Sequence, residues 1–331
     1  MGIRAFDLAK TVRGIADGDR GVLARAITLV ESRRPEDREN ARELLTALSP
    51  RMGRAIRLGI TGVPGVGKST LIDALGALLL TQDLSIAVLA VDPSSRATGG
   101  SILADKTRMP RLATDPRAFV RPSPSGGELG GVARRTREAS LICEAFGFDV
   151  VIVETVGVGQ SETTVADMVD TFLLLALPGA GDDIQSIKRG IMEMVDVVAV
   201  NKAEGDNAPR ARRAARELLG GLRFQRRRHA SWEPKVLTVS ALTGAGIPEL
   251  WSLVVEHRNE LESSGELANL RRAQEQRFLW QLVSDGLLDR FRETPLVKRR
   301  LAELEDGVSA GRGTAGNAAD ELLALYDEAH R

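Results

Sequence analysis

A phosphate-binding motif is the clearest chemical signal in this sequence. Residues 62–69 read GVPGVGKS and match the pattern G-x-x-x-x-G-K-[ST]. An apolar run precedes the motif and a helical pattern follows it, which is the strand–loop–helix context that the motif requires. Backbone N–H groups of such a loop surround phosphates, the lysine supplies positive charge, and the hydroxyl binds Mg²⁺. We therefore expect nucleotide contacts from Gly62, Val63, Pro64, Gly65, Val66, Gly67, Lys68, Ser69 and Thr70.

Acidic residues follow two other apolar runs. Asp92 and Glu154 each come directly after one, and the carboxyl ends of parallel strands face the ligand site. Because Mg²⁺ prefers hard oxygen ligands, we predict that both acids bind it with Ser69, directly or through water, and assist catalysis. Glu154 also begins ETVG, which takes the place of the D-x-x-G switch of GTPases. Asp105 is a further candidate ligand. The alternative is a helix N-cap or a surface acid for Asp92 and Glu154, and a solvated loop carboxylate for Asp105.

A third motif predicts which base is bound. Asn201, Lys202 and Glu204 form N-K-x-E where GTPases carry N-K-x-D. A carboxylate here accepts two hydrogen bonds from guanine, and adenine cannot donate that pair. Glu204 keeps the carboxylate but shifts it by one methylene, so the sequence favours guanine. The remaining candidates follow a later apolar run, where the S-A-x segment of GTPases lies against guanine: Ser240, Ala241 and Leu242.

Three glycine-rich segments are candidate switches. They lie at residues 123–131, 157–162 and 179–188, and ordinary connecting turns are the alternative. Gln160, in the second segment, is a candidate for orienting the attacking water.

The elements that must position these residues follow from the apolar pattern. Continuous apolar runs alternate with helical stretches, which indicates a parallel sheet covered on both faces. The runs lie at residues 56–60, 86–91, 150–153, 172–177, 195–200 and 236–239. We predict an α/β P-loop NTPase with a mostly parallel sheet covered by helices, plus helical N- and C-terminal extensions. The expected domains are an N-terminal helical segment at 1–54, a P-loop GTPase domain at 55–258 and a C-terminal helical segment at 259–331.

Composition narrows the partners. The chain has 331 residues, with 45 Lys+Arg balanced by 45 Asp+Glu, so we expect neither a nucleic-acid nor a membrane partner. The single cysteine, Cys143, cannot form an intramolecular disulfide, and the first residues lack the apolar run of a signal peptide. Both features favour a cytoplasmic location. The three histidines are scattered along the chain and show no metal-binding spacing.

Six strings of this sequence together resemble the MeaB/ArgK group of SIMIBI-class P-loop GTPases. They are GVPGVGKST, DPSSRATGGSILADKTRM, SPSGGELGG, ETVGVGQSE, GAGDDIQSIKRGIMEMVD and NKAEGDN. The resemblance covers residues from about 55 to 250, and Glu204 departs from the commoner Asp. It implies a chaperone of adenosylcobalamin-dependent methylmalonyl-CoA mutase, or of a related acyl-CoA mutase, that gates cofactor delivery and protects or reactivates the enzyme. It also implies a homodimer built largely through the C-terminal helices, and it suggests an adenosyltransferase as a further partner.

The resemblance also implies functional residues in the third switch. That switch would link the nucleotide state to the client enzyme through Asp182, Gln185 and Lys188, with Lys188 taking part in catalysis. The residues show no cobalamin site in this chain.

The predicted activity is hydrolysis of GTP to GDP and phosphate. An ATP-dependent transport-associated ATPase or kinase of the same fold is the main alternative, and it predicts no guanine selectivity. A metallochaperone GTPase for a nickel enzyme predicts a His- or Cys-rich segment, which the sequence lacks. A scaffold with a vestigial nucleotide site conflicts with the retention of Lys68, Ser69 and Glu154.

Overall fold

The structure is a computed structural model of the whole chain. It describes residues 6–32, 34–91, 109–123, 129–155, 161–179 and 189–330. Residues 1–274 and 275–331 form two compact units, and each is described by itself. The domain boundaries predicted at residues 54 and 258 stay predictions.

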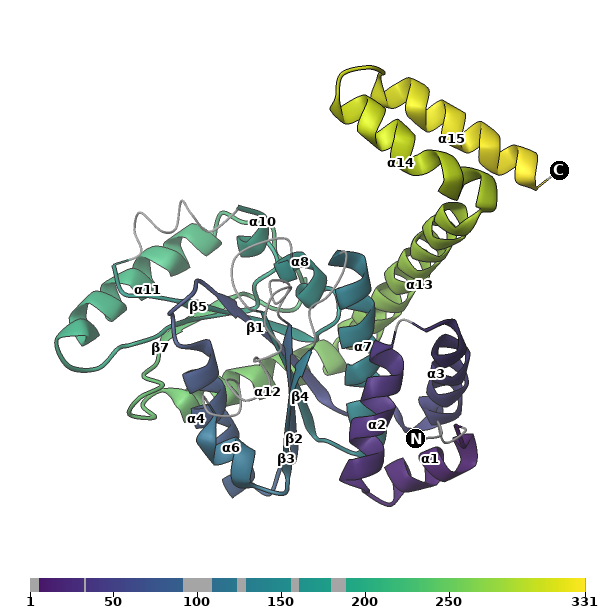
Figure 1. Cartoon of the computed structure of the whole chain (residues 1–331). Coiled ribbons are helices and arrows are strands. Elements are labelled where there is room, and N and C mark those ends of the chain that lie inside the picture. The colour runs from purple at the N-terminus through teal and green to yellow at the C-terminus, as the bar shows by residue number, and fades with distance from the viewer. Residues whose placement is uncertain are drawn as a thin grey trace. The chain divides into compact units, whose positions relative to one another are not determined.

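A parallel sheet forms the centre of the first unit (Figure 1). Among the described residues it has seven strands in the order β3-β2-β4-β1-β5-β6-β7, and every neighbouring pair is parallel. The strands are β1 (Ile56–Gly62), β2 (Ile86–Val91), β3 (Ala118–Ser123), β4 (Val150–Thr155), β5 (Thr171–Ala176), β6 (Val197–Val200) and β7 (Lys235–Thr238). Since all strands run in one direction, their carboxyl ends share one edge of the sheet, where the phosphate loop also begins.

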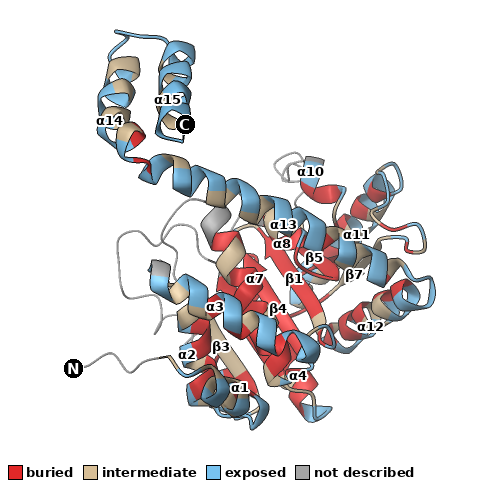
Figure 2. Cartoon of the chain, turned by 90° about the vertical axis from the view of Figure 1, so that its right-hand side faces the viewer, coloured by how far each residue is buried: buried red, intermediate tan, exposed pale blue. Residues whose placement is uncertain are grey.

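Helices cover both faces of this sheet. Side chains alternate between the faces, so that Leu173 and Leu175 of β5 pack on one side while Phe172 and Leu174 pack on the other. The first side is covered by α4 (Lys68–Thr81), α6 (Pro110–Thr114) and α12 (Ile247–Ser263). The second is covered by α7 (Leu129–Phe146), α8 (Ser161–Ala166), α10 (Arg189–Met192) and α11 (Ala208–Leu222). Figure 2 shows the central strands β1 and β4 buried between these layers, whereas β3 at the edge of the sheet is largely intermediate.

The N-terminal helices extend the second face. They are α1 (Leu8–Ala16), α2 (Arg20–Glu31) and α3 (Pro35–Leu48), and they pack on α7 and on the outer part of the sheet. Leu23 and Ile27 of α2 and Leu44 of α3 are fully buried in this layer. Cys143 of α7 is buried beside them, and burial raises the pKa of its thiol.

The second unit is helical. It contains the later part of α13 (Glu266–Glu293), together with α14 (Pro295–Ser309) and α15 (Ala315–Ala329), which pack as a hairpin. Arg300 of α14 pairs with Glu321 of α15 at 2.7 Å. Large apolar side chains on its part of α13 are exposed: Leu279, Trp280, Val283, Leu287 and Leu288.

The predicted fold class is confirmed, with one strand missed. Strand β3 contains Arg121 and Pro122 and lacks a continuous apolar run, so the apolar pattern did not reveal it. Its place at the edge of the sheet tolerates such residues, because an edge strand needs neither two buried faces nor a full set of ladder hydrogen bonds. Within the described ranges, no helix combines the length and apolar character needed to span a membrane.

Candidate functional site

The phosphate loop joins β1 to α4 through a tightly constrained backbone. Gly62 and Gly67 have φ angles of 151° and 98°, which favour glycine. A Cβ at Gly62 would lie 2.6 Å from the carbonyl oxygen of Leu175, and one at Gly67 would lie 2.7 Å from Nδ2 of Asn201. The loop therefore depends on glycine at both positions for its close contacts with neighbouring strands and loops.

Lys68 lies within this loop at the start of α4. Its Nζ donates hydrogen bonds to the carbonyl oxygens of Gly62, at 2.7 Å, and Val63, at 3.4 Å. Burial lowers the pKa of the Lys68 ammonium, and the charges of Glu154 and Glu162 partly oppose that change. An ammonium group shielded in this way interacts more strongly with a phosphate charge than an exposed one does.

Ser69 and Glu154 meet at the carboxyl edge of the sheet. The hydroxyl of Ser69 donates to Oε1 of Glu154 at 3.2 Å. The two groups come together because β4 pairs with β1, with Glu154 opposite Ile60, two residues before the loop begins. A hydroxyl beside a carboxylate is a set of hard oxygen donors that suits Mg²⁺. The predicted ligands Asp92 and Asp105 lie outside the described residues.

Asn201 connects the phosphate loop to the predicted base-binding segment. It follows β6, and its side chain is buried. Its Nδ2 donates to the carbonyl oxygen of Val66 at 2.8 Å, and its Oδ1 accepts from the backbone N–H of Ala241 at 3.0 Å. One amide side chain therefore holds together the three segments that the sequence assigns to nucleotide binding.

Glu204 lies three residues after Asn201, and one of its carboxylate oxygens is buried. Its Oε2 is buried and has no hydrogen-bond partner among the residues that the structure describes. A buried acceptor without a partner is costly, so this oxygen suits a ligand that donates hydrogen bonds. Lys202 is exposed and adopts a left-handed backbone conformation with φ of 60°.

The segment 240–242 forms a turn after β7. Ser240 N–H donates to the carbonyl oxygen of Ala245 at 2.8 Å, and the hydroxyl of Ser240 accepts from Thr243 N–H at 3.1 Å. Ser240 and Ala241 are buried, whereas Leu242 is 73% exposed. The turn is thus fixed by its own hydrogen bonds and leaves an apolar side chain accessible.

The predicted switch residues cannot be placed in the structure. The switch candidates Gln160, Asp182, Gln185 and Lys188 all lie outside the described part of the chain.

Two sets of residues were not singled out by the sequence. Glu162 is fully buried and its charge acts on Lys68; the sequence places it in the candidate switch 157–162 but assigns it no role of its own. His229 and His257, which are scattered along the chain without metal-binding spacing, meet at Asp196 in a buried cluster. The residues of that cluster are far apart in the chain, so no local spacing could reveal it.

Comparisons with known proteins show the family to which the chain belongs. The family model described as methylmalonyl-CoA mutase-associated GTPase MeaB matches residues 23–296. A probable GTPase of Mycobacterium bovis is 55% identical over 96% of this chain and 94% of its own length. The mouse methylmalonic aciduria type A homolog, a mitochondrial protein, is 44% identical over 96% of this chain and 79% of its own. A crystal structure of a LAO/AO transport system kinase has 37% sequence identity to this chain and a TM-score of 0.76. The match covers 99% of this chain and 100% of the kinase chain. The phosphate loop, the buried acid beside Ser69 and these matches together show that the chain belongs to the MeaB family of P-loop GTPases.

Proposed function

We propose that this GTPase is a cytoplasmic chaperone of methylmalonyl-CoA mutase or a related adenosylcobalamin-dependent acyl-CoA mutase. In this role it gates delivery of adenosylcobalamin and protects or reactivates the mutase, and an adenosyltransferase is a further partner. Membership of a family whose description names the mutase is the observation that carries the proposal. Cobalamin itself is assigned to the partners, not to this chain.

The described side chains support a division of labour in GTP hydrolysis. Lys68 stabilises negative charge on the transferred phosphoryl group, from a place where it is shielded from water. Ser69 and Glu154 would hold Mg²⁺, with Asp92 and Asp105 as further ligands. When bound, Mg²⁺ neutralises charge on the phosphate oxygens.

Guanine selectivity follows from Glu204. Its orphaned oxygen needs a donor, and guanine offers two N–H donors on one edge whereas adenine does not. Asn201, Lys202, Ser240, Ala241 and Leu242 complete the proposed base pocket.

Nucleotide state reaches the client through the segment 179–188. Asp182, Gln185 and Lys188 are the proposed coupling residues, Lys188 also taking part in catalysis, and Gln160 is the proposed water-orienting residue.

A homodimer is part of the proposal. Trp280 is 69% exposed, and Val283 and Leu287 follow it at helical spacing in the second unit. An exposed apolar stripe of this kind is typical of an association surface, and a second copy would cover it.

A transport-associated ATPase or kinase remains the second candidate, because the structural neighbour at 37% identity carries that description. The two functions differ in the base that they require, and the carboxylate of Glu204 favours the first.

Complex formation with the client tests the proposal. The full chain is mixed with purified methylmalonyl-CoA mutase and analysed by size-exclusion chromatography, once with GDP and once with a non-hydrolysable GTP analogue. We expect a complex whose stability differs between the two nucleotides. Equal failure to bind in both states, with nucleotide binding intact, would contradict the chaperone role and leave the GTPase assignment standing.

A further inference from the structure

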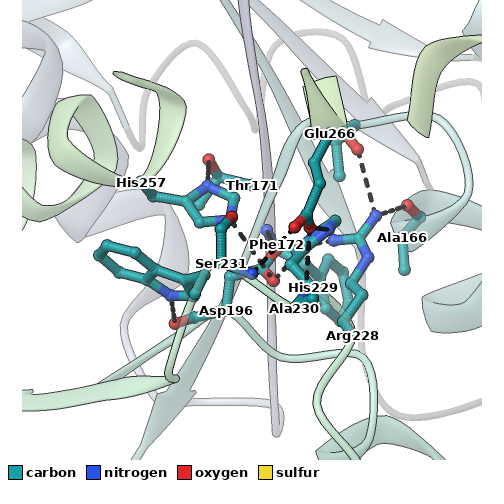
Figure 3. Close-up of polar contacts among 12 residues, drawn as sticks. Ala166, Thr171, Phe172, Asp196, Arg228, His229, Ala230, Ser231, His257 and Glu266 are labelled. Carbon is teal, nitrogen blue, oxygen red and sulfur yellow. Dashed lines mark hydrogen bonds and ion pairs between the residues drawn. The ribbon is translucent and has the colours of Figure 1, made fainter. Parts of the chain in front are cut away.

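A buried cluster of one carboxylate and two imidazoles lies away from the nucleotide site (Figure 3). Asp196 directly precedes β6, His229 lies between α11 and β7, and His257 lies within α12. The exposed fractions of these side chains are 1%, 6% and 0%. Asn201 of the nucleotide site follows the carboxyl end of β6, so the length of this strand separates the two sites.

The three side chains point ligand atoms at one another. Oδ1 of Asp196 lies 3.5 Å from Nε2 of His229 and 3.7 Å from Nε2 of His257, and the three ligand atoms lie within 4.8 Å of one another. Neither Nε2 atom has a hydrogen-bond partner among the described residues. The two separations from Asp196 are close to the ~3.3 Å expected between ligands that are each about 2.0 Å from a tetrahedral Zn²⁺.

The remaining ring nitrogen of His257 has the hydrogen-bond partner that a metal-binding histidine requires, and that of His229 lies near a carboxylate. Nδ1 of His257 lies 2.8 Å from the hydroxyl of Thr171, and Nδ1 of His229 lies 3.7 Å from Oε2 of Glu266. An N–H donated on the Nδ1 side leaves the Nε2 lone pair facing the cluster. Two imidazole lone pairs and a carboxylate oxygen then face one another in a dry interior, which requires a cation or a proton between them.

The two carboxylate oxygens of Asp196 face different partners. Its Oδ2 accepts from Arg228 Nη1 at 2.7 Å and from Phe172 N–H at 2.8 Å, so Oδ1 alone is directed at the histidines. The positive charge of Arg228 opposes cation binding, and the carboxylate of Glu266 near His229 offsets it. Arg228 also donates to the carbonyl oxygen of Ala166 at 2.7 Å, which anchors the segment that carries His229.

We propose that Asp196, His229 and His257 form a structural site for a zinc-class divalent cation. Imidazole and carboxylate ligands suit Zn²⁺ and Co²⁺, and a water would complete the coordination. The ion would tie the α11–β7 connection and α12 to the amino-terminal edge of the sheet. The site is independent of the magnesium site, since none of its ligands takes part in nucleotide binding.

Metal binding to the untagged, chelator-treated and nucleotide-free full chain tests this proposal. Co²⁺ is titrated while its d–d absorption is recorded, and Zn²⁺ is titrated by calorimetry. We expect one ion per chain, an absorption typical of tetrahedral Co²⁺, and a higher melting temperature with Zn²⁺. His330→Gln removes the exposed third histidine as the matched control and should change the affinity by less than about twofold.

Ligand variants decide between a metal site and a proton-linked polar cluster. His229→Gln and His257→Gln should each weaken binding by at least ~100-fold, and Thr171→Val, which keeps all three ligands, by about 10- to 100-fold. If His257→Gln does not fold, His229→Gln, in a connecting segment, gives the same test. No Co²⁺ absorption in the wild-type chain, or unchanged binding in the folded ligand variants, overturns the proposal and leaves a proton or a water at the cluster.

Discussion

Replacing Asn201 with alanine tests how the nucleotide site is held together. The change removes two hydrogen bonds, one to the Val66 carbonyl at 2.8 Å and one from the Ala241 N–H at 3.0 Å. Both backbone partners belong to buried residues, so each lost bond costs about 1.5 kcal/mol. The total of about 3 kcal/mol corresponds to roughly a 100-fold loss of GDP affinity if it falls wholly on binding.

The cost is shared between folding and binding, because both bonds join segments of the folded chain that also form the proposed nucleotide site. We therefore expect the losses in unfolding free energy and in GDP-binding free energy to sum to about 3 kcal/mol. Urea denaturation gives the first quantity, and displacement of a fluorescent GDP analogue gives the second. Asn207→Ala is the matched control, since Asn207 is exposed and makes no side-chain capping bond.

Asn201→Asp separates the two bonds. It keeps an acceptor for Ala241 N–H but places an oxygen opposite the carbonyl oxygen of Val66. Its free-energy cost should therefore be at least that of losing the hydrogen bond to Val66. Changes below about 0.5 kcal/mol in both stability and affinity for Asn201→Ala would refute the role assigned to this residue.

Three further outcomes are expected. Lys68→Ala should lower GTP hydrolysis by about 100- to 1000-fold in a phosphate-release assay, because a buried positive charge at the phosphate loop is lost; full activity would contradict this. Burial lowers the pKa of His229 to about 4 and that of His257 to about 3, whereas both titrate near 6.5 when unfolded. The unfolded chain therefore takes up protons first, and stability should fall as the pH drops below about 6.5, by at most roughly 1.4 kcal/mol per pH unit for each histidine. Chemical unfolding in chelator at pH 7 and pH 5 measures this, and a flat profile would exclude neutral buried histidines. Trp280→Glu with Leu287→Glu should convert the proposed dimer to a monomer in light scattering without changing GDP affinity.

The meeting of Ser69 and Glu154 was predictable because both residues follow a rule of parallel sheets. Glu154 and Ser69 were assigned to one place from their positions after apolar runs, and the structure brings their oxygens within 3.2 Å. Motif spacing and strand direction were sufficient for this, since both residues lie at the carboxyl edge of paired strands.

The cluster at Asp196 could not be predicted from motif spacing and strand direction. The apolar pattern places Asp196 only within an expected strand. His229 lies on the α11–β7 connection and His257 lies on α12. They meet because α12 and the segment before β7 pack against the same end of the sheet, which depends on tertiary packing. Likewise, the orphaned oxygen of Glu204 is a property of its surroundings, and the N-K-x-E motif alone could not show it.

Competition between GTP and ATP for the site tests the central claim most directly. The nucleotide-free chain is loaded with a fluorescent GDP analogue in Mg²⁺, and each unlabelled nucleotide is titrated against it. We predict that GTP displaces the probe at concentrations at least ~100-fold lower than ATP does, because only guanine donates the hydrogen-bond pair to the carboxylate of Glu204, whose Oε2 is buried. Equal displacement by ATP would contradict a guanine-specific switch.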